Sequence, residues 1–373
     1  MVFFRMPRQL KPIDPLYGAL DSGGSHSHDR LPAIMKKLWK YLVICFLISS
    51  SFTSSAQNSE AKLTLDKIIE HAENSSLYRK NVDWTALKKA MYVLAKNADS
   101  VTHLKPALDL MLKELNDTHG RVFHNNQYLS YYSGEKKEHR KNIDWDVYTE
   151  IQSTQVYEFK ATNIQDSIGY VRLVGLPMGD NQKMSADIQN AVCKVIENGA
   201  KKWILDLRYN GGGNMFPMVE GITNIIGDGI VGGTKGLTED ESSVWQIKGG
   251  DFFYDEQNVA IENKCPIPEI QKVAVLTSVY TASSGEALAV ILKNRPKTRF
   301  FGNKTMGMVT ATDYNQIDSL TAMMISVSYY KDRESNLYNK YVDVDEIIDF
   351  EPKAETSKDK GISRAIEWLN ENK

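Results

Sequence analysis

Hydrophobic residues recur every three or four positions between residues 63 and 115, a spacing that predicts amphipathic helices. Three segments share this spacing: Leu65 to Ile69, Trp84 to Leu94 and Leu104 to Leu115. The pattern ends at a polar segment, NDTHG at 116–120, whose glycine closely follows the last apolar turn. The sequence therefore predicts a small helical subdomain over residues 62–118, with His119 directly after it.

Short apolar runs alternate with helical patterns along the second half of the chain. The predicted strands cover 169–174, 203–207, 273–277, 298–302 and 323–329. The predicted helices cover 185–197, 215–226, 284–292 and 361–369. Strands that alternate with helices indicate an α/β domain with a central sheet, here residues 166–373. Residues 119–165 form a connecting segment, for which the sequence predicts irregular structure and short strands such as 154–159.

The first 56 residues have the features of a targeting segment rather than of a fold. Residues 1–34 are polar and show no periodicity. From Met35, where translation is expected to begin, a basic start (MKKLWK) precedes an apolar core (YLVICFLI) and an exit of small residues. This order predicts a secretory signal peptide over residues 35–56 and a mature chain that begins near Gln57. We therefore expect export to the periplasm or the extracellular space, with the membrane engaged only through this segment.

Composition and charge argue against some classes of function. A formal net charge of −2 gives no electrostatic reason to expect nucleic acid as a partner. The three cysteines, Cys45, Cys193 and Cys265, form no CxxC pattern and no His/Cys cluster, so no metal site is indicated and no cofactor is expected. Cys193 and Cys265 could pair in an oxidising compartment, but the sequence leaves open whether they lie close enough.

A serine occupies the point where a predicted buried strand passes into a predicted helix. The strand 273–277 is followed by a short polar turn, and the helix begins at Ser284 with Glu286 in its first turn. Backbone N–H groups at a helix start have no partner within the helix, so they point at whatever the Ser283 hydroxyl attacks. Ser283 is therefore a candidate nucleophile. The alternative is that Thr281, Ser283 and Ser284 only cap the helix.

A glycine turn follows another predicted strand, 203–207. Three consecutive glycines, at 211–213, let the backbone approach a ligand closely and aim N–H groups at an anion or an oxyanion. Asp206 and Arg208 precede the glycines at the strand end. The turn is not a P-loop, because no Gly-Lys-Ser/Thr follows, and it lacks the GxGxxG spacing of dinucleotide sites. A flexible hairpin is the alternative interpretation.

Together these motifs resemble those of the carboxyl-terminal-processing (tail-specific) serine peptidase family. Four motifs occur in the family's order over residues 62–372: LNDTH at 115–119, DLRYNGGG at 206–213, TASSGE at 281–286 and GNKTMG at 302–307. The resemblance implies a crotonase/ClpP-like sheet-and-helix catalytic domain preceded by a small helical subdomain. It also implies Ser283 as nucleophile and an oxyanion hole formed by Gly212, Gly213 and the Ser284 amide. The supporting residues that it suggests are Glu286 and Arg208.

The expected general base is a histidine, because the chain departs from the family's Ser/Lys pattern. Met308 holds the position of the lysine, and Lys304 belongs to a different position of the same turn. Similarity to the tricorn-like branch of the family implies His119 as base, although a histidine alone in a loop is usually structural. The same branch places an orienting carboxylate in the loop where Asp332 and Glu334 are both candidates. An unperturbed imidazole has a pKa of about 6.5, so a rate limb near neutrality is expected, shifted by burial.

The spacing between the motifs leaves no room for a PDZ domain, which many members of the family carry before the catalytic domain. Only residues 120–168 separate His119 from the first predicted strand. The resemblance thus implies a serine endopeptidase that hydrolyses proteins or unstructured protein tails through an acyl-enzyme. One alternative is an inactive relative that binds peptides or a small apolar ligand, and another is an acyl-transfer enzyme. The expected partner is a protein or peptide substrate, and the oligomeric state stays open.

Overall fold

The computed structural model describes residues 60–134, 140–141, 143–153, 158–165, 167–258, 261–262, 264–266, 271–352 and 358–371. The predicted signal segment, residues 1–34 and Gln57 lie outside these ranges. Within them, no helix is long and apolar enough to cross a membrane.

Three helices form where the helical spacing predicts them. They are a helix over residues 60–75, α2 (Trp84–Leu94) and α3 (Lys105–Glu114), with short 3-10 helices η1 (Arg79–Asn81) and η2 (Val101–Leu104) between them. Asp83 caps α2 by accepting a hydrogen bond from the N–H of Ala86. Their buried faces pack against strand residues Val122, Met323 and Ile325. The helices therefore share one core with strands that lie far from them in the sequence.

Those strands belong to an antiparallel sheet of nine strands in the described part of the chain. Its path is β2-β1-β13-β6-β7-β8-β9, and β12 and β14 also pair with β13. The strands are β1 (Arg121–His124), β2 (Gln127–Tyr131), β6 (Gly229–Lys235), β7 (Ser243–Lys248), β8 (Asp251–Tyr254), β9 (Gln257–Asn258), β12 (Thr310–Gln316), β13 (Thr321–Asp332) and β14 (Leu337–Tyr338). The long strand β13 includes the predicted strand at 323–329 and extends beyond it at both ends. It pairs with β1 on one side and with β6 on the other.

A second sheet of six strands has the order β15-β11-β10-β5-β4-β3 and is parallel except where β3 meets β4. Its strands are β3 (Lys160–Gln165), β4 (Ile168–Arg172), β5 (Lys202–Asp206), β10 (Val273–Thr277), β11 (Thr298–Gly302) and β15 (Glu346–Ile347). The predictions of β4, β5, β10 and β11 are thus confirmed to within two residues at each end. Residues 154–157 of the predicted strand 154–159 lie outside the described ranges, and β3 begins only at Lys160.

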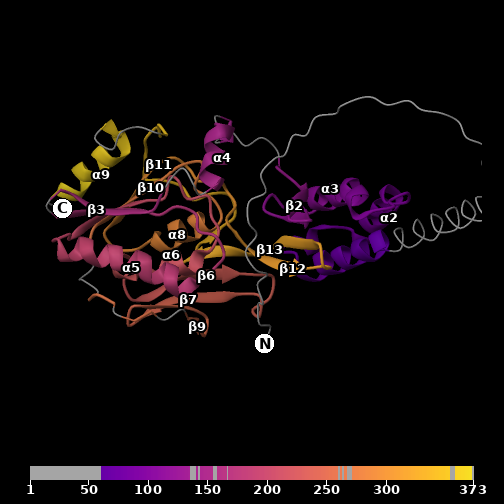
Figure 1. The fold of residues 1–373 in the computed structure, drawn as a ribbon, viewed down its shortest axis with the longest axis horizontal. Coiled ribbons are helices and arrows are strands. Elements are labelled where there is room, and N and C mark those ends of the chain that lie inside the picture. Colours follow the sequence, from indigo (N-terminus) through magenta and orange to yellow (C-terminus); the bar gives the residue numbers. More distant parts are fainter. Residues whose placement is uncertain are drawn as a thin grey trace, which may run out of the picture. The chain divides into compact units, whose positions relative to one another are not determined.

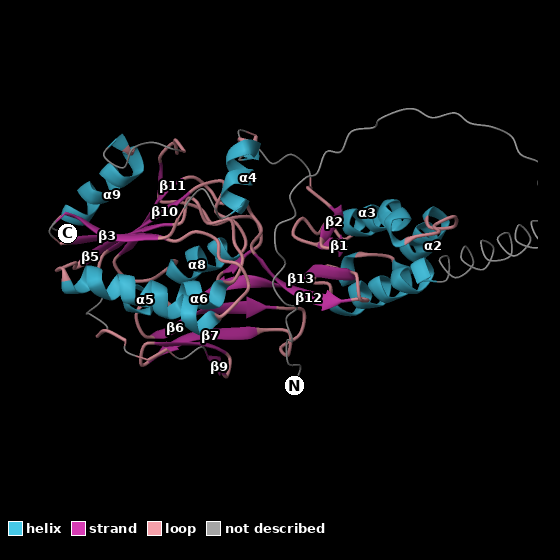
Figure 2. Ribbon diagram, in the orientation of Figure 1, coloured by secondary structure: helices cyan, strands magenta, loops and turns pink. Residues whose placement is uncertain are grey.

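Helices cover both faces of this second sheet (Figures 1 and 2). The remaining helices are α4 (Trp145–Ser153), α5 (Asn181–Glu197), α6 (Met215–Glu220), α7 (Thr223–Ile226), α8 (Ser284–Leu292) and α9 (Lys360–Asn370). Side chains of α5, α6 and α8 pack against one face of β5 and β10, and α9 packs against the other. The single helix predicted at 215–226 is in fact two helices, interrupted at Gly221 and Ile222. The α/β fold class is confirmed.

A disulfide joins Cys193 on α5 to Cys265, with Cα atoms 5.7 Å apart and a sequence separation of 72. The pairing that the sequence left open is therefore present in the structure. A cross-link that closes a loop of this length restricts the unfolded chain strongly.

Removing this disulfide should lower the free energy of unfolding by about 4 kcal/mol, because the unfolded chain regains the freedom of the closed loop. Urea unfolding of the Cys193→Ser/Cys265→Ser variant, compared with the oxidised wild type, measures the loss. The reduced wild type is the matched control and should unfold with the variant. Equal unfolding midpoints for all three proteins would contradict the prediction.

Candidate active site

Ser283 lies at the turn between β10 and α8, as the strand-to-helix pattern predicts. Its backbone has φ 52° and ψ −119°, a conformation that residues with a side chain rarely adopt. The Ser283 N–H donates to the carboxylate of Glu286 in the first turn of α8, at 3.0 Å. A strained, half-buried serine held by its backbone at a strand-to-helix turn is the arrangement of a nucleophile elbow.

The glycine turn lies directly against Ser283 because β5 and β10 are parallel neighbours whose carboxyl ends meet. At Gly212, with φ 106°, a Cβ would lie 2.8 Å from the Cβ of Ser283, so only glycine fits. Hydrogen bonds join the turns that follow the two strands, including one from the Ala282 N–H to the Asn210 carbonyl at 2.9 Å. The structure thus brings Ser283 and the predicted oxyanion turn together.

The three predicted oxyanion donors differ in their hydrogen bonds. The Gly212 N–H donates to the side-chain oxygen of Asn210 at 3.0 Å. Within the described part of the chain, no hydrogen bond uses the N–H of Gly213 or of Ser284. The Ser284 hydroxyl donates to the Gly213 carbonyl at 2.6 Å and so fixes the glycine turn to the start of α8. The N–H groups of Gly213 and Ser284 are therefore the two predicted donors that have no acceptor among the described residues.

Glu286 connects the serine turn to the segment that holds Met308. Its buried carboxylate accepts hydrogen bonds from the Thr305 hydroxyl and from the N–H groups of Gly307, Met308 and Ser283. Burial raises the pKa of Glu286 to about 6, although these four donors act in the opposite direction. The predicted supporting residue is therefore an acceptor that holds the backbone on both sides of the site.

His119 lines a cleft of about 530 Å³ together with Met308 and Thr310. Its Nδ1 lies 2.9 Å from the Thr310 hydroxyl, and no hydrogen bond of its Nε2 occurs among the described residues. Burial lowers the pKa of His119 to about 4, with Arg121 adding to this effect and Asp117 opposing it. The imidazole is therefore neutral at neutral pH.

A chain of hydrogen bonds determines which imidazole nitrogen carries the proton. The Ser326 hydroxyl donates to the carboxylate of Asp117 at 2.7 Å, so its oxygen can only accept from Thr310, 2.9 Å away. Thr310 in turn can only accept from His119. The proton of the neutral ring thus resides on Nδ1, and Nε2 keeps its lone pair. This is the tautomer that a general base requires.

Replacing Thr310 by valine should lower kcat by about 10–100-fold, because the ring loses the acceptor that fixes its tautomer. KM should change little, since the hydroxyl is turned toward His119 and Ser326. Steady-state kinetics on a peptide substrate measures both constants. Thr312→Val, on the same strand, is the control and should retain most of the activity. A fully active Thr310→Val enzyme would contradict this role for the hydrogen-bond chain.

Asp332 and Glu334, the two candidate orienting carboxylates, make no hydrogen bond to His119. Asp332 is buried and accepts hydrogen bonds from Asn294, Asn336 and Tyr338, as well as from the N–H of Glu334. The side chain of Glu334 is exposed. No hydrogen bond or ion pair in the described part of the chain joins either carboxylate to the histidine. Asp117 is the carboxylate that the structure links to the ring.

Arg208 and Lys304 also have partners of their own. Arg208 forms a buried ion pair with both carboxylate oxygens of Asp206 and a further pair with Asp359, which caps α9. Its support of the site is therefore indirect, through the end of β5. The Lys304 ammonium donates to the Tyr341 hydroxyl at 3.0 Å, and this bond, with nearby Asp343, raises its pKa. Such an ammonium keeps its proton at neutral pH.

Ser283 lies near the buried side chain of Tyr330 on β13, and its hydroxyl opposes the rise in the pKa of that phenol. Burial, together with the charge of Glu286, raises the pKa of Tyr330, so the phenol keeps its proton. No hydrogen bond between Ser283 and His119 occurs in the described part of the chain. Ser283 and His119, the two predicted catalytic residues, are therefore not hydrogen-bonded to each other in this conformation.

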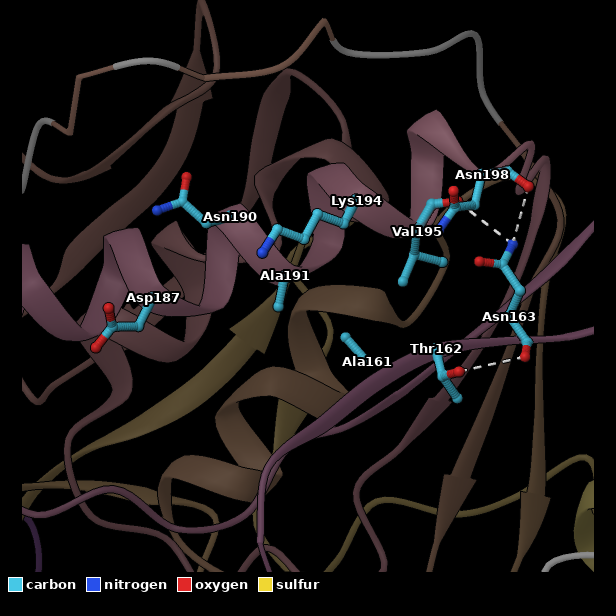
Figure 3. Close-up of a pocket in the computed structure, with 9 residues that line it drawn as sticks. All are labelled: Ala161, Thr162, Asn163, Asp187, Asn190, Ala191, Lys194, Val195 and Asn198. Carbon is cyan, nitrogen blue, oxygen red and sulfur yellow. Dashed lines mark hydrogen bonds between the residues drawn. The ribbon is translucent and has the colours of Figure 1, made fainter.

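A second cavity, of about 540 Å³, lies between β3 and α5 (Figure 3). Its walls are mainly polar, and Asn163 donates to the carbonyl groups of Val195 and Asn198, both at 3.4 Å. Lys194 and Asp187 both belong to its rim and carry opposite charges. None of the predicted site residues lines it, whereas His119 lines the cleft of about 530 Å³.

Sequence reasoning missed four residues of the site, Asp117, Thr310, Ser326 and Tyr330. Asp117 offered a signal, because it lies two residues before His119 in the polar segment. The other three are strand residues with no distinguishing pattern. Their roles depend on pairing between segments that are far apart in the sequence, such as Asp117 and Ser326.

Comparison with known proteins agrees with this arrangement of sheets and helices. Residues 167–348, which include the glycine turn and Ser283, match the model of peptidase family S41. This region of the chain is thus identified with that family of peptidases. The family expectation of the sequence analysis is therefore confirmed.

Individual relatives are distant. The chain is 22% identical over 303 residues to the nisin-resistance protein of Lactococcus lactis subsp. lactis, covering 81% of this chain and 84% of that protein. A lipoprotein from Streptococcus agalactiae has a similar structure, with a TM-score of 0.62, 16% identity and coverage of 83% and 95%. The photosystem II D1 C-terminal processing protease aligns with a TM-score of 0.50, 16% identity and coverage of 79% and 93%. At these identities the structural matches establish the fold.

Proposed function

We propose that this protein is a serine endopeptidase that cleaves proteins or unstructured protein tails through an acyl-enzyme, with Ser283 as nucleophile and His119 as base. The observation that carries the proposal is the strained serine at the start of α8, packed against the glycine turn. Membership of a peptidase family supports it, as does the tautomer of His119.

In the proposed mechanism, the Ser283 hydroxyl comes within hydrogen-bond reach of His119 when substrate enters. His119 Nε2 takes the proton as Oγ attacks the peptide carbonyl carbon. The oxyanion receives hydrogen bonds from the N–H groups of Gly213 and Ser284. The imidazolium then gives its proton to the leaving amine as the C–N bond breaks. Water, deprotonated by the same nitrogen, releases the acyl group.

Incubation of the purified protein with an unstructured polypeptide, followed by mass spectrometry of the products, tests this function. Internal cleavage that is lost in the Ser283→Ala variant is the expected result. An intact polypeptide after prolonged incubation with the wild type would overturn the proposal.

A binding protein without catalysis is the second candidate. Two observations favour it: Met308 at the position of the family's lysine, and the absence of a hydrogen bond between Ser283 and His119 in the described part of the chain. Peptide binding without cleavage, with no difference between wild type and Ser283→Ala, would be its signature.

We also infer that the protein is exported to the periplasm or the extracellular space. The charged, apolar and small-residue order at 35–56 supports this, as does the Cys193–Cys265 disulfide, since such bonds persist in oxidising compartments. One structural relative is described as a lipoprotein. Mass spectrometry of the exported protein should find a terminus near Gln57. An intact Met1 or Met35 terminus in the cytoplasm would contradict export.

A further inference from the structure

Two arginine side chains lie near the proposed catalytic residues, one associated with each. Arg121 follows His119 by two residues, and its Nη1 donates to the carbonyl oxygens of Thr118 and Gly120, at 3.1 and 2.6 Å. Arg140 Nε donates to the Met306 carbonyl at 2.6 Å. Both guanidinium groups are thus held by backbone carbonyl groups.

A short series of hydrogen bonds along the backbone connects Arg140 to Ser283. Its acceptor Met306 directly precedes Gly307, whose N–H donates to the carboxylate of Glu286. The same carboxylate accepts the Ser283 N–H. Thr118 and Gly307 both line the His119 cleft. Arg121 contacts Thr118 and Arg140 contacts Gly307, so both arginine side chains lie at the margin of this cleft.

The charges of these arginines lack a carboxylate partner in the part of the chain that the structure describes. Burial lowers the pKa of Arg140, and the charge of Arg121 lowers it further, while Glu286 and Tyr148 oppose this. Glu286 already accepts four hydrogen bonds. The positive charge of Arg121 disfavours that of Arg140, and an anion bound near both would relieve this cost.

An aromatic ring lies beside Arg121, and further tyrosines lie near both arginines. Arg121 lies over the ring of Tyr131, 5.8 Å from its centroid. Both arginines act electrostatically on the Tyr148 hydroxyl of α4, and so does Tyr128. Tyr128 and Tyr131 are 67% and 56% exposed, so their rings are open to a ligand. Planar guanidinium groups match the two oxygens of a carboxylate, and exposed rings suit the rest of a peptide.

We propose that Arg121 and Arg140 form a carboxylate-binding subsite that selects peptides carrying a carboxylate near the scissile bond. This inference rests on the proposed peptidase function and names a substrate class for it. An acidic side chain and the free α-carboxylate of a peptide end present the same chemistry, and the experiment separates them.

Three peptides of one length test the subsite: a neutral peptide with an amidated end, the same peptide with one glutamate, and the neutral peptide with a free carboxyl end. We expect kcat/KM of the wild type to be about 10–100-fold higher for at least one carboxylate peptide than for the neutral one. Preference for the glutamate identifies a side chain as ligand, and preference for the free end identifies the terminus. Equal values for all three peptides would overturn the proposal.

In Arg121→Met and Arg140→Met the ratio between carboxylate and neutral peptides should fall toward one. Arg121→Lys and Arg140→Lys keep the charge and should restore part of it, which separates recognition from loss of folding. Arg364→Met is the control, because Arg364 on α9 pairs with Glu346 at 2.7 Å, and it should keep the wild-type ratio. An unchanged ratio in both methionine variants would also overturn the subsite.

Binding to the Ser283→Ala protein separates failure of the subsite from failure of the peptidase function. Fluorescence anisotropy of labelled versions of the three peptides measures affinity without cleavage. If the wild type cleaves nothing while Ser283→Ala binds the carboxylate peptides about 10–100-fold more tightly, only the peptidase function fails. If the wild type cleaves all peptides equally and Ser283→Ala binds them equally, only the subsite fails.

Discussion

The Ser283→Ala variant should lose peptide hydrolysis by at least about 10⁴-fold while remaining folded. The Ser283 hydroxyl is the proposed attacking group, and the Ser283 N–H, which alanine also has, donates to the carboxylate of Glu286. Alanine therefore removes the nucleophile and leaves the hydrogen bond of the turn. Rates on an unstructured peptide, with circular dichroism as a check of folding, measure the effect.

Ser284→Ala is the matched control on the neighbouring residue. This variant loses the hydrogen bond from the hydroxyl to Gly213 but keeps the N–H proposed to bind the oxyanion. One neutral hydrogen bond corresponds to a loss of less than about tenfold. Equal loss from the two variants would show that the nucleophile is misassigned.

Replacing His119 by alanine should lower kcat by about 10³-fold or more, whereas Lys304→Ala should stay close to the wild type. The imidazole is neutral with Nε2 available, while the pKa of Lys304 is raised by Tyr341 and Asp343, so its ammonium cannot accept a proton. Parallel kinetics of the two variants decides between these bases. An inactive Lys304→Ala with a nearly normal His119→Ala would contradict the assignment.

The pH profile provides a further readout of the base. The pKa of His119 is lowered to about 4, so Nε2 stays unprotonated above that pH. Protonation of the ring should therefore lower kcat/KM only near pH 4. A separate limb near pH 6 is expected where Glu286, with its pKa raised to about 6, takes up a proton and loses acceptor capacity. Glu286→Gln should remove only the upper limb. A limb at about 6.5 that persists in Glu286→Gln would indicate an unperturbed imidazole.

Local patterns were sufficient to predict the parts of the fold that depend on neighbouring residues. The strand β10 is buried at all five positions, and its apolar run gave both of its ends. The same change from apolar strand to helix formers located Ser283. The hairpin strands β6 to β9 were not predicted, since Gly229–Lys235 is rich in glycine and its partner is the distant β13.

The environment of His119 depends on tertiary contacts and could not be predicted from local sequence. The motif located the residue, but its burial and the acceptor on Thr310 come from strands about two hundred residues later. These contacts lower the pKa of His119 to about 4, below the value expected for a free imidazole. Asp332 and Glu334 were chosen as candidate acids by position in a loop, and a loop pattern contains no information about where a side chain turns.

The most direct test of the account is the site of covalent labelling by a fluorophosphonate. The wild-type protein should form one adduct on Ser283, located by mass spectrometry of its peptides, because this is the serine proposed to attack beside the N–H groups of Gly213 and Ser284. The His119→Ala variant should be labelled much more slowly, and Ser283→Ala not at all. An unlabelled wild type, or an adduct on another serine with Ser283 unmodified, would contradict the account.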